Sequence, residues 1–554
     1  MTTLAERVQA RAHERRWLIL GVLCFSLLVI VLDNSILNVA LPSIVRQLHA
    51  TNSQLQWMVD SYTLVFAGLL LTMGSIGDKF GRRPALQAGF LIFGAGSLLS
   101  ALAGSPNQLI ASRAFMGIGG ALIMPATLSI ITNVFSGSER PKAIGVWAAT
   151  AGVGVALGPL TGGALLEHFY WGSIFLVNLP IVTVGVLAGV LLIPNSKDPR
   201  APRLDVPGAL LSIAGLSALL YAVIQGPSTG WTAPRTLTFF AVGGLLMAAF
   251  FAWERRVDHP MLDVRFWRNP RFSGASAAIA ITFFAMFGSI FLLTQYLQFV
   301  LGYSPLATGL RLLAFAVPMM VISPLAPNLV KRIGTKLTVA AGLACNAAGL
   351  IALGGLGQTA TLPDLTWRMA LAATGMALTM SPATESIMGS LPLARAGVGS
   401  AVNDTTRQVG GAVGVAVIGS IFSSLYGSKV VSALRGRVPA SVVHNAKQQL
   451  GNALQAATHL PGAAARSFVT LAKGAFLDGF QAGTWVGAAV VLIGVVIVLR
   501  WLPARARAED VDRQDAEFKA EWVTAGIPAD GQPAPVDGGQ PGEATRPPTP
   551  ARSP

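Results

Sequence analysis

Apolar runs of about 20 residues, the length that an α-helix needs to cross the hydrocarbon core of a bilayer, recur along the first 502 positions of the chain. Short polar stretches rich in Gly, Pro and charged residues separate these runs. The pattern predicts an all-α polytopic membrane protein. Fourteen helices are expected, at residues 17–37, 55–76, 85–103, 108–131, 143–166, 173–194, 207–226, 235–253, 273–298, 305–329, 337–357, 367–391, 398–424 and 476–502.

Basic residues are spread unevenly over the loops that this pattern defines. The N-terminal tail and the loops on its side hold 21 Lys and Arg, whereas the short loops on the other side hold Arg46, Arg235 and Arg368. Because basic loops stay in the cytoplasm, both termini are expected there. The excess of Arg over Lys is typical of a GC-rich bacterial genome, so the expected location is a bacterial cytoplasmic membrane. The long loop at 425–475, expected outside, is an exception, since it also carries six basic residues.

Composition and charge exclude several other classes of protein. The 554 residues are 53% hydrophobic and 12% charged, against about 25% charged in soluble domains. The net charge of +15 lies mostly in short loops, so no nucleic-acid partner is expected. The histidines are scattered, and the sequence contains no metal-binding spacing, phosphate loop or catalytic triad. We therefore expect neither an enzyme nor a bound metal or cofactor, and energy would come from an ion gradient.

An internal repeat predicts how the helices are grouped. The segment DKFGRR at 78–83 follows the second predicted helix, and KRIGTK at 331–336 follows the tenth with the same Gly and basic spacing. Eight helices separate the copies, which predicts two six-helix halves around an inserted pair, a 6+2+6 arrangement of the kind found in transporters. The expected parts are a cytoplasmic segment 1–16, an N-terminal half 17–200, an inserted pair 201–258, a C-terminal half 259–503 and a disordered cytoplasmic tail 504–554.

Five segments together resemble the motifs of one family. They are LDNSILNVALP at 32–42, GSIGDKFGRRP at 74–84, RAFMGIGGA at 113–121, GVALGPLTGG at 154–163 and YLQFVLGYSPLATG at 296–309. In this order on fourteen expected spans, they are similar to the major facilitator superfamily, and more narrowly to its fourteen-spanner drug:proton antiporter family of multidrug and antibiotic efflux transporters. The resemblance covers about residues 15–502 and implies the major facilitator fold.

The resemblance also implies two sets of functional residues. A cytoplasmic gating motif would comprise Gly74, Asp78, Gly81, Arg82 and Arg83, and an antiporter motif would comprise Gly154, Gly158, Pro159, Gly162 and Gly163. Gly154, Gly158 and Gly162 recur every four residues, which gives a smooth stripe for close approach of another helix. The resemblance implies that this stripe packs across the interface between the halves. Lys331 stands in the second copy of the repeat where the first has Asp78, so an acidic switch carries over to the N-terminal half alone.

Three charged residues fall inside apolar runs of the N-terminal half. Asp33, Asp60 and Arg113 are expected at similar depth in the outer half of the membrane, where each charge costs roughly 2.5 to 3.5 kcal/mol on insertion scales. They are candidates for a buried proton-coupling cluster, in which Arg113 pairs with a carboxylate until a proton releases it. The alternative is a neutralised cluster that only ties helices together.

A second polar set combines the C-terminal half with two amides of the first helix. The inner part of the membrane is expected to hold Glu385, Asp404 and Arg407. Two amides, Asn34 and Asn38, follow Asp33 along the chain. These residues would either contact a cationic substrate or form an inter-helix salt bridge of Arg407 with Glu385 or Asp404. The salt bridge is slightly favoured.

These observations predict proton-coupled efflux of amphipathic drugs or antibiotics across the cytoplasmic membrane by alternating access. The expected partners are a small amphipathic organic substrate, protons and the lipid bilayer, and the transporter is expected to work as a monomer. Alternatives are a dedicated exporter of one metabolite or self-made antibiotic, a proton-coupled importer, and a polytopic membrane enzyme or lipid-handling protein.

Overall fold

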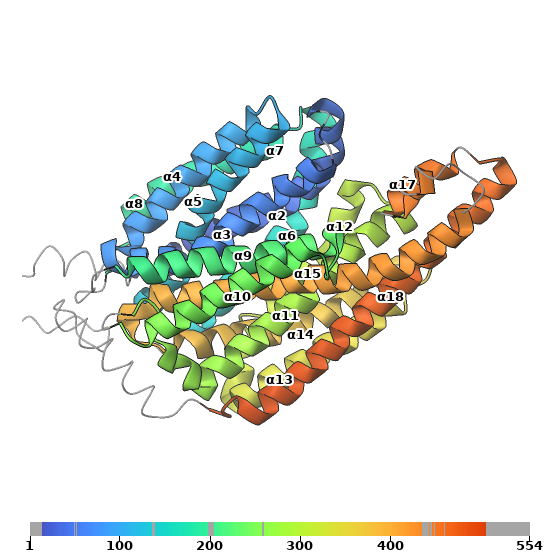
Figure 1. The fold of residues 1–554 in the computed structure, drawn as a ribbon. Helices are drawn as coiled ribbons and strands as arrows, with labels where there is room; N and C mark the ends of the chain where they lie inside the picture. The colour runs from blue at the N-terminus through green and yellow to red at the C-terminus, as the bar shows by residue number, and fades with distance from the viewer. Residues whose placement is uncertain are drawn as a thin grey trace, which may run out of the picture.

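The computed structural model describes residues 14–48, 50, 52–135, 139–197, 204–257, 260–434, 442–443, 446–447, 449–458 and 460–505. Within these ranges the regular structure is helical and contains no strand (Figure 1). The long helices are α2 (Arg16–Leu48), α3 (Asn52–Phe80), α4 (Arg82–Ala101), α5 (Pro106–Val134), α6 (Arg140–His168), α8 (Asn178–Leu192), α9 (Val206–Thr229), α10 (Pro234–Glu254), α11 (Pro270–Gln295), α12 (Pro305–Ile322), α13 (Ala326–Gly354), α14 (Leu362–Met388), α15 (Ala396–Leu434) and α18 (Gly462–Trp501). Shorter elements are α7 (Ser173–Leu176), α17 (Leu450–Ala457), η1 (Val264–Arg268), η2 (Tyr296–Val300) and η3 (Leu393–Arg395).

Local sequence determines where several of these helices begin. Each of five described helix starts has a side-chain oxygen that accepts a hydrogen bond from a backbone N–H of the first turn, and a Pro follows at the first or second helical position. Pro fits there because the first N–H groups of a helix have no partner within the helix. Each such cap contributes about 1 kcal/mol. The capping residues are Ser105, Asp205, Asn269, Ser304 and Thr361.

Twelve described helical segments are long and apolar enough to cross a membrane, so the expected count of fourteen is not established. The two expected spans outside this set lie in α12 and α14. The apolar part of α12, Leu306–Ile322, is short. The 27 residues of α14 include three charged side chains, those of Asp364, Arg368 and Glu385, which lower its hydropathy. Both helices nevertheless pack inside the bundle, α12 against α6 and α14 against α13.

Two expected loops are largely helical in the structure. The segment 331–336 lies within α13, where the only break is a non-helical backbone at Gly334. The expected loop 425–475 is also wrong in extent, because α15 continues to Leu434 and α18 begins at Gly462. At 1.5 Å per residue each of these helices is about 60 Å long, twice the bilayer core of about 30 Å. Their ends therefore project past the membrane beside α17 (Figure 1).

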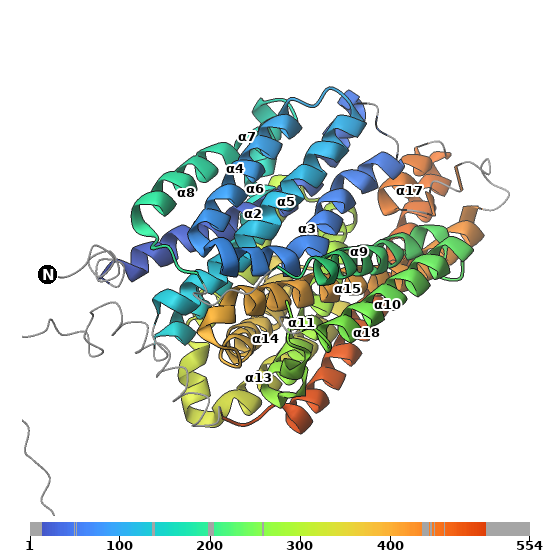
Figure 2. The same ribbon diagram turned by 60° about the vertical axis from the view of Figure 1, so that its left-hand side comes forward.

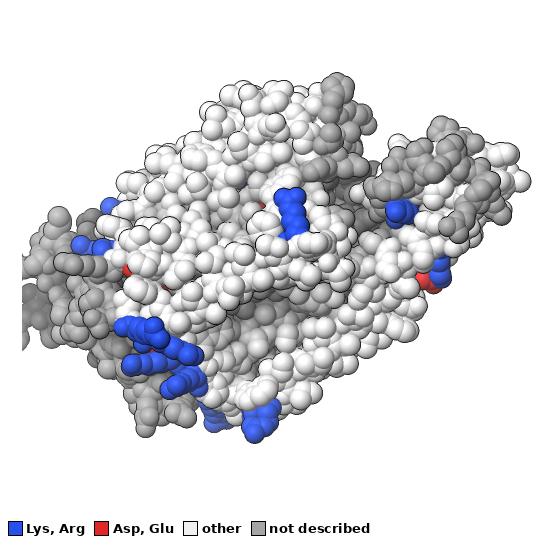
Figure 3. Space-filling view, viewed as in Figure 1, with Lys and Arg blue, Asp and Glu red and all other residues white. Residues whose placement is uncertain are grey.

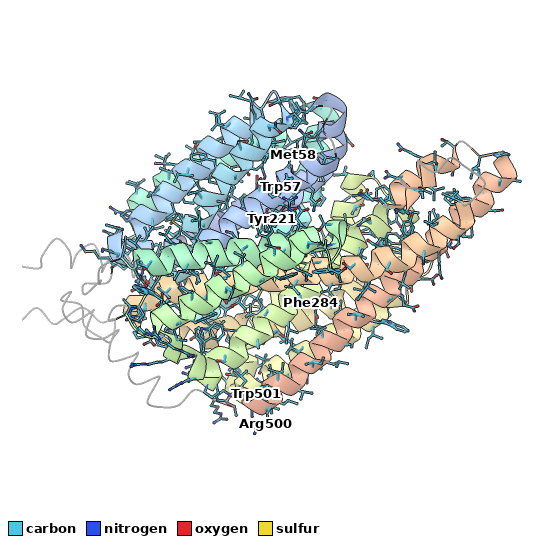
Figure 4. All side chains as sticks on the ribbon, in the orientation of Figure 1. Trp57, Met58, Tyr221, Phe284, Arg500 and Trp501 are labelled. Atoms are coloured by element: carbon cyan, nitrogen blue, oxygen red, sulfur yellow. The ribbon has the colours of Figure 1, made fainter. Side chains whose placement is uncertain are left out.

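The helices form two lobes with a helix pair between them (Figure 2). The first lobe contains α2 to α8, in which α5 packs against α3 and α4, and α6 packs against α2. The second contains α11 to α18, in which α13 packs against α14 and α18, and α15 packs against α11. Helices α9 and α10 pack on each other, and α9 contacts both α3 and α15. Trp57 of α3 lies against Tyr221 of α9, with ring centroids 5.8 Å apart (Figure 4).

The repeated segment has the same backbone geometry in both lobes. Gly81 and Gly334 take φ angles of +114° and +83°, a region that side-chain-bearing residues rarely adopt. The residue after each glycine donates its backbone N–H to a carbonyl just past the last long helix of its own lobe: Arg82 to Ser196 at 2.9 Å, and Thr335 to Ala504 at 2.8 Å. The same local contact therefore closes each lobe, although the second copy of the repeat lacks the acidic residue.

Both described ends of the chain lie at one end of the bundle, which we call the terminal end. Figure 4 shows Arg500 and Trp501 there, at the end of α18, and the blue helix α2 begins on the same side (Figure 1). Figure 3 shows Lys and Arg gathered over this end and few of them on the rest of the visible face. The opposite end carries α7 and α17 (Figure 1).

Candidate functional site

A buried ion pair lies inside the first lobe. Arg113 of α5 pairs with Asp33 of α2, and neither side chain is exposed. Asn178, at the start of α8, donates from Nδ2 to Asp33 Oδ1 at 2.9 Å and is 2.9 Å from Ser97 Oγ. Arg113 Nε donates to the carbonyl of Met58 on α3 at 3.2 Å. Residues far apart in the sequence thus bring one acid and one base together in an otherwise apolar interior.

Aromatic rings complete the surroundings of this pair. The Arg113 guanidinium lies 4.5 Å from the centroid of the Tyr62 ring and 5.9 Å from that of Phe175. Among the described atoms, the Tyr62 hydroxyl and Arg113 Nη2 have no hydrogen-bond partner. Removing one member of a buried ion pair costs about 3 to 5 kcal/mol, because the other charge stays buried without compensation. Protonation of Asp33 would disturb the lobe in the same way.

Asp60 lies apart from this pair. The structure records no hydrogen bond or ion pair between Asp60 and either Asp33 or Arg113. Asp60 is half-buried, and its Oδ2 atom is buried without a partner. The pair Asp33–Arg113 is therefore assembled as a unit, whereas Asp60 is a separate acid on α3.

The expected gating segment ties the two lobes together at the terminal end. Asp78 accepts hydrogen bonds from the backbone N–H groups of Gly397 at 2.9 Å and Val398 at 3.0 Å, at the start of α15. It also pairs with Arg82 at 2.9 Å, and Arg82 donates to the Leu393 carbonyl at 2.9 Å. A carboxylate at a helix N-terminus is favoured by the partial positive charge there, so α15 holds Asp78 while this end is closed.

The glycines of this segment have different local roles. A Cβ on Gly74 would lie 2.6 Å from Ala401 Cβ and from the Gly397 carbonyl, so Gly74 allows α3 and α15 to touch. Gly81 provides the turn described above. Arg83 points along its own lobe and donates to the Ile193 carbonyl at 3.4 Å.

A second contact joins the lobes at the same end. Arg140, the first residue of α6, reaches Glu385 of α14 with an Nη2–Oε1 distance of 2.7 Å and Nε–Oε distances of 3.1 and 3.2 Å. Its side chain is 7% exposed and that of Glu385 is 14% exposed. Glu385 therefore pairs across the interface with Arg140 rather than with Arg407. The sequence placed Arg140 among loop residues that set orientation and gave no signal for this partner.

Asp404 and Arg407 form a buried pair on α15, with an Nη1–Oδ1 distance of 3.6 Å. Arg407 donates to Thr384 of α14 at 3.1 Å. Its guanidinium lies 4.8 Å from the ring of Trp147 on α6, so it also meets the first lobe. Asp404 Oδ2, Arg407 Nε and Trp147 Nε1 are buried without hydrogen-bond partners. The side chain of Arg407 is therefore packed between α15, α14 and α6, where the two lobes meet.

The glycine stripe of α6 does not pack where we expected. A Cβ on Gly154 or Gly162 would meet Val31 or Ile36 of α2, and one on Gly158 would clash with Ser35. Ser35 also donates to the Gly154 carbonyl at 3.1 Å. The expectation that this stripe packs across the interface is therefore wrong, because the stripe faces α2 within the first lobe.

A different face of α6 lies against the second lobe. A Cβ on Gly152 would lie 2.8 Å from Met319 of α12, and one on Gly163 would lie 3.3 Å from the backbone of Leu306. A Cβ on Gly309 of α12 would lie 3.2 Å from Cβ of Pro159 on α6. Gly163 and Pro159 thus belong to the interface, whereas the four-residue stripe does not.

Of the two candidate amides of α2, the structure describes the side chain of Asn34. Asn34 Nδ2 donates to the Ile30 carbonyl of its own helix at 3.0 Å. The Asn38 side chain lies outside the described part of the chain. Asn178, which donates to Asp33, was not among the residues predicted from the sequence, although an Asn inside the apolar run 173–194 was a usable signal.

Comparisons with known proteins agree with this architecture. A sequence profile described as "Major Facilitator Superfamily" matches residues 23–415. The chain is 34% identical over 493 residues to the multidrug efflux pump LfrA of Mycolicibacterium smegmatis, covering 88% of this chain and 96% of LfrA. It is 33% identical over 473 residues to the methyl viologen resistance protein SmvA of Salmonella typhimurium, covering 84% and 93%.

Two further similarities extend over most of the chain. It is 29% identical over 520 residues to the tetracenomycin C resistance and export protein of Streptomyces glaucescens, covering 92% of this chain and 96% of that protein. The crystal structure of the proton:xylose symporter XylE superposes with a TM-score of 0.57 at 16% identity, covering 91% of this chain and 98% of XylE. The latter likeness concerns the fold alone.

Proposed function

The chain belongs to the major facilitator superfamily, a family of membrane transporters and not of enzymes, and we propose that it exports amphipathic drugs or antibiotics in exchange for protons by alternating access. Similarity to a multidrug efflux pump and to drug resistance proteins supports the direction and the class of substrate. The observation that carries proton coupling is the fully buried Asp33–Arg113 pair. A charge costs several kcal/mol in this setting, so gain or loss of a proton at Asp33 changes which packing is preferred.

In this proposal the terminal end faces the cytoplasm of a bacterial cell. The gathering of Lys and Arg at that end supports this orientation, because basic residues are retained on the cytoplasmic side. The division into two six-helix halves and an inserted pair is part of the proposal. The matching glycine geometry of the two repeat copies supports it, since Gly81 and Gly334 occupy equivalent places in the two lobes.

The contacts at the terminal end correspond to a state closed toward the cytoplasm. Asp78 with the start of α15, and Arg140 with Glu385, join lobes that must separate before a substrate enters from inside. The lobes rock about their long interface, which includes α6 against α12. Because these contacts exist in one state alone, their whole interaction energy stabilises that state.

The exchange of substrate for protons depends on the state in which Asp33 and Asp60 can bind a proton. With the cytoplasmic end open, Asp33 is ionised and paired with Arg113, and the substrate is bound. After the lobes rock, protons from outside reach the acids, Asp60 and then Asp33, and the substrate leaves. The protonated carrier then returns, and Asp33 and Asp60 release their protons inside, so that both acids are ionised again. Asp404 is a further acid in this scheme. It either contacts a cationic substrate or pairs with Arg407, whose guanidinium lies against Trp147 of the first lobe.

A dedicated exporter of one antibiotic is the second candidate. The similarity to an export protein named for the single compound tetracenomycin C favours it. The two candidates share the coupling chemistry and differ in the number of chemotypes accepted.

Purified protein in vesicles with an imposed proton gradient tests the proposal. Methyl viologen and tetracenomycin C are added in turn, within a panel of unrelated amphipathic compounds, and collapse of the gradient is followed with a pH-sensitive dye. Collapse with several chemotypes supports multidrug antiport, and collapse with one supports the dedicated exporter. Transport of a compound that leaves the proton gradient untouched contradicts proton coupling.

A further inference from the structure

Two carboxyl groups face each other at the terminal end of the inserted helix pair. Asp205 caps the start of α9, and Glu254 is the last residue of α10. Glu254 is 3% exposed, although it lies next to the exposed residues Arg255 and Arg256. Buried acids are rare unless they are paired or neutral. The burial of Glu254 therefore needs an explanation that the transport cycle does not provide.

Each carboxyl group uses one oxygen for structural hydrogen bonds. Asp205 Oδ1 accepts from the Gly208 backbone N–H and from the Trp253 indole N–H, both at 2.9 Å. Glu254 Oε2 accepts from the backbone N–H of Leu262 at 3.0 Å. These bonds hold the start of α9, the end of α10 and the linker to α11 at one point.

The other oxygen of each group has no donor. Asp205 Oδ2 and Glu254 Oε1 are both buried and lack a hydrogen-bond partner. They lie next to the same point, since a Cβ on Gly208 would touch both of them. The groups that face Glu254 are the Asp205 carboxyl from α9 and the backbone N–H groups of Met261 and Leu262 from the linker. Within the described part of the chain, no cationic side chain is among them.

We propose that Asp205 and Glu254 hold one proton between their free oxygens, as a carboxyl–carboxylate pair. Two ionised acids whose free oxygens lie next to one point repel each other strongly in a buried site, and a shared proton removes one charge. The same proton gives both unpartnered oxygens a hydrogen bond. This proton-binding site is separate from Asp33, and the inference holds whether or not the chain is an antiporter.

The shared proton also stabilises the place where the end of α10 and the linker to α11 meet the start of α9. Loss of the proton leaves two facing negative charges at the point where α9, α10 and the linker meet. We therefore expect the thermal stability of the protein to fall as the pH rises and the pair loses its proton.

Infrared difference spectroscopy of the full chain in lipid nanodiscs tests the site. The wild-type protein is expected to show the C=O stretching band of a protonated carboxyl group, shifted in D2O and lost at alkaline pH. Glu254→Gln and Asp205→Asn each supply an amide N–H in place of the proton, so both variants should fold and lack this contribution. Glu167→Gln alters an exposed acid at the end of α6 and is the matched control.

Melting temperatures measured over the same pH range provide a second readout. The alkaline loss of stability should be smaller in Glu254→Gln and Asp205→Asn than in the wild type or Glu167→Gln. An unchanged carboxyl band in both variants overturns the proposal. A wild-type protein without that band, whose melting temperature rises with added Mg²⁺ only when both acids are present, overturns it in favour of a cation site.

Discussion

Glu385→Gln tests the proposed role of the contacts at the terminal end. Arg140 and Glu385 join the two lobes through three close N–O contacts of 2.7 to 3.2 Å. Their side chains are 7% and 14% exposed, so the pair lies between an exposed ion pair, worth about 0.2 to 1 kcal/mol, and a buried pair whose disruption costs about 3 to 5 kcal/mol. We take about 2 kcal/mol for the loss of this ion pair, which corresponds to about 30-fold in an equilibrium constant.

The predicted effect is therefore a population shift of about 30-fold toward the state open at the terminal end. It can be measured from distances between spin labels on Phe80→Cys and Ile333→Cys, in a chain that carries Cys24→Ala and Cys345→Ala. Phe80 and Ile333 are exposed and precede the two equivalent glycines, one in each lobe. The wild type should give mainly the shorter distance, and Glu385→Gln should increase the longer one.

Controls separate the interface contact from general damage. Glu139→Gln breaks the Arg16–Glu139 ion pair, which lies at the same end but within the first lobe, and should leave the distances unchanged. Arg140→Gln with Glu385→Gln should give nearly the same shift as either change alone, because both remove one interaction. An unchanged distribution in Glu385→Gln, or an equal shift in Glu139→Gln, refutes the reasoning.

Three further substitutions test proton coupling, the packing of α6 against α2 and the backbone geometry at Gly81. Asp33→Asn leaves Arg113 without its counter-ion and should abolish proton-linked efflux in vesicles with equal amounts of protein; undiminished efflux removes Asp33 from the mechanism. Gly158→Ala forces a methyl group against Ser35 and should lower the melting temperature, whereas Gly21→Ala, with open space around it, should not. Gly81→Ala strains a backbone at φ +114° by about 1 to 3 kcal/mol, and an unchanged melting temperature would argue against that geometry.

Much of the fold could be predicted because membrane crossing imposes a strong constraint on sequence. Apolar length alone located most of the helices, and the repeated segment pointed to the two equivalent turns at Gly81 and Gly334. Helix ends that leave the bilayer follow no such constraint, so the extensions of α15 and α18 were missed. The count of fourteen spans is not established for a related reason, since α14 carries charges that are satisfied inside the bundle, as Glu385 is by Arg140.

The candidate site could be predicted only in part. A base and an acid inside apolar helices need partners, which made a contact between Asp33 and Arg113 an expected outcome. The position of Asp60 and the partner of Glu385 depend on how helices are rotated and which helices meet. Four-residue spacing likewise reveals a smooth face on α6 but not its neighbour, which is why the stripe with Gly158 was assigned to the wrong interface.

In the proposed cycle a proton and the substrate compete through the acid at Asp33. This competition is measured as the number of protons released when substrate binds to the purified protein in weakly buffered solution. We expect proton release from the wild type and its loss in Asp33→Asn, with Glu167→Gln unchanged. Equal release from Asp33→Asn, with substrate bound as tightly as in the wild type, would contradict it.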